Sequence, residues 1–84
     1  MSLHTDGNAI AGLLEEIFAA DVTVTPRTCQ SCRRQNPIGA HRHYAGAGHV
    51  LRCPSCGDLA ASIVAVGDSY AVSLHGTWLL NRAR

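Results

Sequence analysis

The stretch that decides the fold begins with Cys29-Gln30-Ser31-Cys32 and ends with Cys53-Pro54-Ser55-Cys56-Gly57, and twenty residues separate the two cysteine pairs. Two cysteines with two residues between them can point both thiolates at one cation from a tight turn. A tetrahedral site needs two such turns, and two pairs at this separation are typical of zinc sites. The sequence therefore predicts a structural zinc ion, with the intervening segment as a hairpin that joins the turns. The predicted ligands are Cys29, Cys32, Cys53 and Cys56.

Two other roles for the four cysteines remain open. Iron is also bound by two such pairs, as in a rubredoxin-like electron-transfer site. A redox dithiol or a disulfide is less favoured, because neither pair opens a helix within a β-α-β pattern. Four thiolates leave a zinc ion without an open position for water, so we expect no catalytic residues and a protein that is not an enzyme.

Each pair, together with the residue after it, is called a knuckle below: residues 29–33 form the first knuckle and residues 53–57 the second. The second knuckle resembles those of the zinc-ribbon class, which read Cys-Pro-x-Cys-Gly, and the resemblance covers about residues 27–75. Gly57 tolerates a left-handed backbone that lets N–H groups point at the sulfur atoms. The first knuckle has neither the Pro nor the Gly. We therefore expect mild backbone strain at Arg33.

The whole chain also resembles a family of short uncharacterised proteins from high-GC bacteria. Members open with a His-Thr-Asp-Gly-Asn stretch, present here from His4 to Asn8, continue with a Leu-Leu-Glu-Glu helix and end in one such ribbon. That family has no assigned function. The resemblance therefore implies a fold and a metal, and little about activity.

The composition is that of one small globular domain spanning residues 1–84. Its 84 residues are 46% apolar and 15% charged, with a net charge of +1. A chain of this size buries only about 60–65% of the surface that its unfolded form exposes, so its core is marginal and a metal ion would add stability. The longest apolar runs are far shorter than the ~20 residues of a membrane-spanning helix. We expect a cytoplasmic protein, where cysteines serve as metal ligands more often than as disulfides.

Periodicity predicts an α+β fold: an N-terminal amphipathic helix packed on a small antiparallel β-sheet with a four-cysteine zinc ribbon. The helix is expected over residues 6–20, with Asp6 as its N-cap. Its apolar face comprises Ile10, Leu13, Leu14, Ile17 and Phe18. The ribbon sheet is expected within residues 27–75, and a turn at Gly67-Asp68 closes its last hairpin. Expected strands cover residues 22–25, 40–44, 49–52, 59–66, 69–75 and 77–80.

Histidines and aromatic residues give weaker indications. His41 and His43 are two residues apart, so a strand places them on one face; this face can hold a second metal, but an exposed polar surface is the favoured interpretation. His49 precedes Cys53 by four residues and is a candidate contact of the metal ligands. Tyr70 and Trp78 can stack on nucleic acid or support self-association, although the core needs them more.

Charge is distributed unevenly along the chain. Residues 22–57 contain no acid and five arginines, namely Arg27, Arg33, Arg34, Arg42 and Arg52. These cations can neutralise the thiolates, or they can form a binding surface. We expect a non-enzymatic binding or adaptor module whose hairpin meets an acidic protein surface through Arg33, Arg34, Arg42 and Arg52. The alternatives are a nucleic-acid-binding ribbon and a rubredoxin-like electron carrier or accessory to an oxidoreductase.

Overall fold

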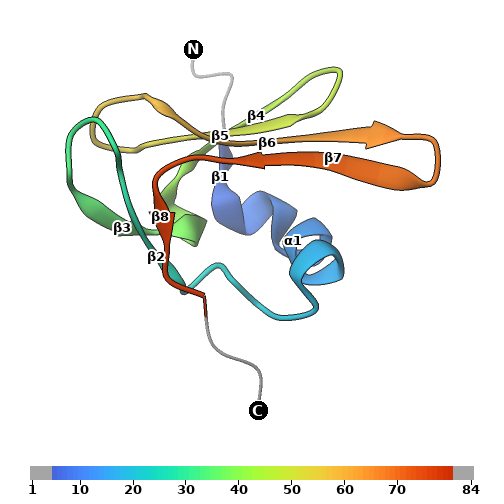
Figure 1. Ribbon diagram of the computed structural model, residues 1–84, viewed down its shortest axis with the longest axis horizontal. Helices are drawn as coiled ribbons and strands as arrows, with labels where there is room; N and C mark the ends of the chain where they lie inside the picture. The colour runs from blue at the N-terminus through green and yellow to red at the C-terminus, as the bar shows by residue number, and fades with distance from the viewer. Residues whose placement is uncertain (1–4, 81–84) are drawn as a thin grey trace.

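The computed structural model describes residues 5–80, which form one short N-terminal helix and two antiparallel sheets, an α+β architecture (Figure 1). The larger sheet has the strand order β1-β4-β5-β6-β7, and the smaller has the order β3-β2-β8. His4, which opens the stretch shared with the resembling family, lies outside the described residues. In order, the elements are β1 (Thr5–Asp6), η1 (Gly7–Ile10), α1 (Ala11–Phe18), β2 (Pro26–Thr28), β3 (Gln35–Pro37), η2 (Ile38–Ala40), β4 (Arg42–Ala45), β5 (His49–Arg52), β6 (Leu59–Val66), β7 (Ser69–Leu74) and β8 (Thr77–Trp78).

The N-terminal helical segment is capped by Asp6, as predicted. The Asp6 carboxylate accepts a hydrogen bond from the backbone N–H of Asn8 at 3.1 Å. The α-helix itself is shorter than the expected 6–20, because its first turn is the 3-10 helix η1 and α1 starts at Ala11. It ends at Phe18, where Ala19 adopts a left-handed backbone with φ of +56°.

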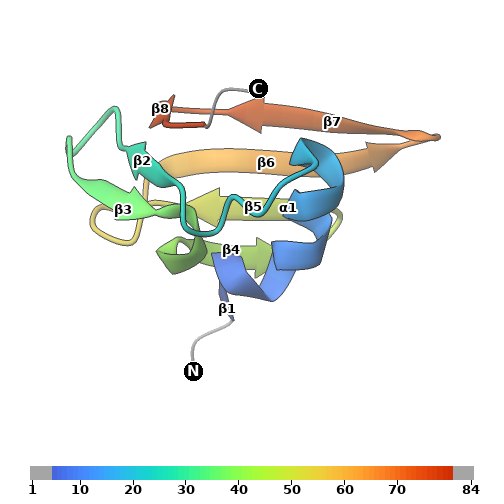
Figure 2. The same ribbon diagram turned by 90° about the horizontal axis from the view of Figure 1, so that it is seen from below.

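Helix α1 lies across one face of the five-stranded sheet (Figure 2). Leu14 is fully buried and Ile10 almost so, and both join the core with Leu51 and Ile63 from the sheet. The remaining members of the predicted apolar face are partly buried against the same core; they are Leu13, Ile17 and Phe18. The apolar face of the helix is therefore used in covering the sheet.

The smaller sheet differs from expectation. Residues 22–25 form a turn, in which the N–H of Thr25 donates to the carbonyl of Val22 at 3.0 Å, and the strand starts only at Pro26. Proline lacks an N–H to give to a ladder, so it is tolerated as the first residue of a strand. Strand β8 pairs with β2 and not with the β6–β7 hairpin, so it belongs to the other sheet.

The larger sheet follows the sequence pattern closely. Strands β5 and β6 have the expected bounds, and the Gly67-Asp68 turn joins β6 to β7, with φ of +60° at the glycine. Strand β4 starts at Arg42, later than expected, because the preceding residues form η2. The segment between the knuckles is not one hairpin: β3 pairs with β2, whereas β4 and β5 pair in the larger sheet. No helix within residues 5–80 is long and apolar enough to cross a membrane.

Candidate metal centre

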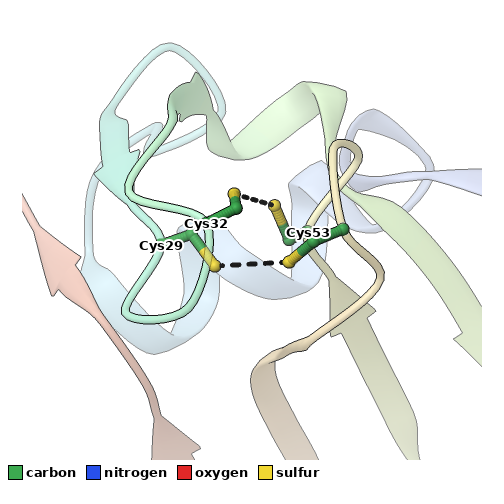
Figure 3. Close-up of side chains that lie close together, drawn as sticks. Cys29, Cys32 and Cys53 are labelled. Carbon is green, nitrogen blue, oxygen red and sulfur yellow. Dashed lines mark hydrogen bonds between the residues drawn. The ribbon is translucent and has the colours of Figure 1, made fainter.

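The first knuckle forms the turn between β2 and β3. The carbonyl of Cys29 accepts from the N–H of Arg33 at 3.1 Å, and the N–H of Cys29 donates to the carbonyl of Arg34 at 2.9 Å. These two bonds close a loop from which the side chains of Cys29 and Cys32 both point toward the second knuckle (Figure 3).

The second knuckle repeats this frame between β5 and β6. The carbonyl of Cys53 accepts from the N–H of Gly57 at 2.9 Å, and the N–H of Cys53 donates to the carbonyl of Asp58 at 2.8 Å. The expected left-handed residue occurs in both knuckles, with φ of +80° at Gly57 and +65° at Arg33. Arg33 therefore carries the strain that the sequence predicted, since a side chain disfavours this region.

The two knuckles face each other and bring four sulfur atoms together. All four Sγ atoms lie within 4.8 Å of one another. Two of the sulfur–sulfur distances join opposite knuckles, at 3.6 Å between Cys29 and Cys56 and 3.7 Å between Cys32 and Cys53. A tetrahedral zinc ion with Zn–S distances of about 2.3 Å places its sulfur ligands about 3.8 Å apart. The four thiols therefore fit one tetrahedral metal ion.

These distances do not fit disulfides. A disulfide needs a sulfur–sulfur distance of about 2.05 Å, and all four cysteines have free thiols. Cys29 and Cys53 are buried, Cys32 is half-buried and Cys56 is exposed. The cluster is therefore buried on the side of Cys29 and Cys53 and nearer to solvent at Cys56.

The backbone of the knuckles favours the thiolate form of two cysteines. Hydrogen bonding by the backbone N–H groups of Cys32 and Ser31 outweighs burial and lowers the pKa of the Cys29 thiol to about 6. Burial acts to raise the pKa of Cys53, but N–H groups of its own knuckle outweigh it and the pKa is lowered. The backbone hydrogen bond at Asp58 acts to lower the pKa of the Cys56 thiol, but desolvation and the three neighbouring sulfur groups outweigh it and raise that pKa to about 11. A cation supplies the charge that four adjacent thiolates need.

Asp58 links the two knuckles, a role that the sequence analysis missed. Its carboxylate accepts hydrogen bonds from the side-chain amide of Gln30, at 2.6 Å, and from the hydroxyl of Ser31. The hydroxyl bond is the main cause of a pKa below the usual value for Asp58. The residues between the cysteines of the first knuckle are thus attached to the residue that follows the second. The available signal was an acid directly after Cys-x2-Cys-Gly, in a segment otherwise free of acids.

Arg27, the fifth arginine of residues 22–57, lies inside the protein and is not part of a surface. Its side chain is 1% exposed. The guanidinium donates to the carbonyl of His75 at 2.9 Å and to the side chain of Gln30 at 2.8 Å, and it lies 3.2 Å from Nε2 of His41. Arg27 therefore joins β2, the first knuckle and the end of β7 from inside the protein.

The other four arginines are exposed around the knuckles, and together they are called the arginine rim: Arg33, Arg34, Arg42 and Arg52. Arg42 and Arg52 are directly paired across β4 and β5. Both side chains hydrogen-bond to the second knuckle: Arg42 donates to the carbonyl of Pro54 and Arg52 to that of Gly57, each at 3.2 Å. The rim thus has members beside both knuckles.

The histidines are not the exposed polar surface that the sequence analysis favoured. His41 is fully buried, and its Nδ1 lies 2.9 Å from the carbonyl of Pro37. His43 is 6% exposed and lies between Thr5 and His49, with its Nδ1 2.6 Å from the Thr5 hydroxyl and its Nε2 2.9 Å from Nδ1 of His49. The two imidazoles also stack, with centroids 5.1 Å apart. Within residues 5–80, the hydrogen-bonding and stacking partner that the structure gives His49 is therefore His43.

The two candidate aromatic residues have separate surroundings. Trp78 packs on the core and stacks on Phe18, with centroids 6.0 Å apart. Tyr70 lies on β7 and is half-exposed. The favoured core role therefore holds for Trp78, whereas Tyr70 is outside the core.

Comparison with known proteins gives one relationship. Neither the curated proteins nor the solved structures yield a match to this chain. A family model matches residues 1–84, the whole of the sequence. The chain belongs to the family of unknown function DUF6510.

Proposed function

We propose that this protein is a zinc-ribbon binding module, in which the four cysteines hold a structural zinc ion and the arginine rim meets a partner. The observation that supports it most is the pairing of two similar knuckles with four sulfur atoms within 4.8 Å of one another. Zinc accepts four thiolates in a tetrahedral arrangement without preference from d-electrons, and a site with four protein ligands has no position left for a substrate. Such a metal stabilises the fold and performs no reaction.

The arginine rim supports a partner with negative charge. Its four members are exposed, while the nearest carboxylate in sequence, Asp58, is already bound to Gln30 and Ser31. Arg42 and Arg52 also lie directly opposite each other, and like charges in that position are unfavourable unless a counter-charge is present. An acidic protein surface would supply that counter-charge. Four arginines make a small footprint for binding a polyanion such as nucleic acid.

The ligand set can be tested by X-ray absorption spectroscopy of the purified protein. A single shell of four sulfur atoms at about 2.3 Å around zinc is the expected result. A spectrum with nitrogen or oxygen in the shell would contradict the closed site. An iron edge in place of zinc, with the red colour of ferric tetrathiolate, would favour electron transfer instead.

The rim can be tested with a double variant, Arg34→Ser with Arg42→Ser. The complex isolated from cells should lose its partner in this variant, while zinc content and melting temperature stay close to those of the native chain. Glu15→Gln with Glu16→Gln on the exposed side of α1 is the matched control and should keep the partner. Retention of the partner by the arginine variant would overturn the role of the rim. If the captured partner is a nucleic acid, its affinity should fall steeply with salt, and the protein partner would be the wrong proposal.

A further inference from the structure

The β6–β7 hairpin extends beyond the part of the sheet that α1 covers, with its turn at the far end from the knuckles (Figure 1). Its exposed part is apolar: Val66 is 59% exposed and Tyr70 is 42% exposed, and Val64 and Leu74 are exposed to a similar degree. Asp68 is the one charged residue in the sequence from 59 to 74. An apolar hairpin with so little charge is unusual on a surface that meets only water.

Strand β7 is also an edge of the sheet. Among the described residues it pairs with β6 alone, over six residues in a register without irregularity. Edge strands are normally protected by lysine, proline, a bulge or short length. In β7 none of these protections occurs. The strand therefore offers a free set of backbone hydrogen-bonding groups.

The hydrogen-bonding pattern between β6 and β7 identifies the residues of β7 whose backbone groups are unpaired. In an antiparallel pair, successive residues direct their backbone groups alternately to the two sides. Val66 and Ser69 pair across the two-residue turn, so Ser69 and every second residue after it bond to β6. Tyr70, Val72 and Leu74 are left with N–H and C=O groups that point away from the sheet.

Within β7, the segment from Tyr70 to Leu74 is symmetric in side-chain size about Val72. Tyr70-Ala71-Val72-Ser73-Leu74 reads large, small, large, small, large in both directions. Antiparallel pairing of this strand with itself therefore places large apolar residues opposite large ones and small residues opposite small ones. Because residues 69–74 carry no charge, that arrangement brings no like charges together across the two strands. This pattern fits a second copy of the same chain.

We propose that β7 pairs antiparallel with β7 of a second copy, about a two-fold axis at Val72, to join the two five-stranded sheets edge to edge. In this register Tyr70 lies opposite Leu74 of the second copy, and Val72 lies opposite its equivalent. The three residues with outward backbone groups meet in hydrogen-bonded pairs. The same register places Ser69 opposite His75 of the second copy and Asp68 opposite its Gly76, so the single carboxylate of the hairpin does not face its own copy.

One strand of six residues forms a small interface. It buries much less than the ~1,600 Å² of a typical stable complex. The association should therefore depend on concentration, and sedimentation of the full chain should show the mass double as concentration rises. Tyr70→Lys with Leu74→Lys puts cations opposite each other across the axis and should keep the mass monomeric at every concentration. The matched control, Val24→Lys with Leu79→Lys, changes two exposed apolar residues away from β7 and should associate like the native chain.

Amide hydrogen exchange of the unmodified protein gives a second measurement that needs no variant. The N–H groups of Tyr70, Val72 and Leu74 should exchange more slowly as concentration rises, while those of Ser69, Ala71 and Ser73 stay protected at all concentrations. Circular dichroism and zinc content must match the native chain for the lysine variant to be used. A native chain that stays monomeric, a lysine variant that still dimerises, or exchange at the three outward amides that ignores concentration would each overturn the proposal.

Discussion

Arg33 and Gly57 occupy the same position in the two knuckles, with φ of +65° and +80° and the same hydrogen bond back to the carbonyl of the first cysteine. The two turns are thus conformational copies, although their sequences differ at this residue. Glycine adopts this backbone without a steric cost, whereas a residue with a Cβ pays about 1–2 kcal/mol. The first knuckle keeps its shape in spite of that cost.

Arg33→Gly should relieve this strain. We expect the free energy of unfolding to rise by up to about 1 kcal/mol. Part of this gain is offset, because glycine raises the conformational entropy of the unfolded chain. Urea denaturation of the zinc-loaded protein is the measurement. The converse variant, Gly57→Ala, should lower stability by a similar amount, because a Cβ there meets no atom within 4 Å and only the backbone is unfavourable. Equal stability of both variants and the native chain would show that these positions are not strained.

Asp58→Asn tests the link between the knuckles. The variant removes the charge that strengthens the hydrogen bonds from Gln30 and Ser31. We expect a lower melting temperature and faster transfer of zinc to a chelator, with the zinc content at rest unchanged. Asp21→Asn is the control, because Asp21 is an exposed carboxylate that bonds within its own turn, to Thr23. Zinc release at the native rate in the Asp58 variant would mean that the knuckles do not need this link.

Stability should fall on mild acidification because two buried histidines resist protonation. Burial is the main cause of a pKa below the usual 6.5 for both His41 and His43. Between the two pKa values, the unfolded chain binds more protons than the folded chain. The stability that neutral His41 and His43 contribute is therefore fully present above the unfolded pKa of 6.5, and it is lost as the pH falls through their pKa values in the folded protein.

The matching measurement is the denaturation midpoint as a function of pH, with His41→Gln for comparison. This variant should lose part of the dependence just below pH 6.5 and keep the part that belongs to His43. Zinc content is followed at each pH, so that loss of metal is not counted as histidine protonation. An identical pH profile for the native chain and the variant would contradict the role of His41.

Asp6→Ala should weaken the start of the helix alone. The Asp6 carboxylate bonds to the N–H of Asn8, and loss of such a cap costs about 0.5–2 kcal/mol. Thermal unfolding measures the loss, and the zinc content should not change. Asp6→Asn, which retains an accepting oxygen, should recover most of the stability. A stable alanine variant would place the cap elsewhere.

The sequence predicted those parts of the fold that depend on local pattern. Spacing alone identified the four cysteines. An apolar, β-branched run identified β6, the Gly67-Asp68 pair identified the turn, and period-two alternation after the turn identified β7. Side chains whose surroundings come from distant segments were not predicted. Arg27 is an arginine, and its burial becomes visible only when the carbonyl of His75 and the side chain of Gln30 are placed around it. The histidine pair was missed for the same reason, because β4 and β5 must be in register before His43 meets His49.

The bounds of α1 and β2 were also beyond the sequence pattern. Apolar periodicity does not separate the 3-10 helix η1, which ends at Ile10, from α1, which starts at Ala11, because both helix types place residues three apart on nearly the same face. Residues 22–25 are β-branched like a strand, yet the chain turns there to bring Val22 into the core. At residues 22–25, tertiary packing outweighed local propensity.

Metal removal tests the central claim most directly, namely that one ion held by the four cysteines is part of the fold. Native mass spectrometry of protein purified without added metal should show one zinc ion per chain, and Cys53→Ser should lose it. Binding of structural zinc in small domains is coupled to folding with apparent energies of about 10–16 kcal/mol. A chelator should therefore abolish cooperative thermal unfolding, and zinc should restore it. A metal-free chain that still unfolds cooperatively at the same temperature would contradict the account.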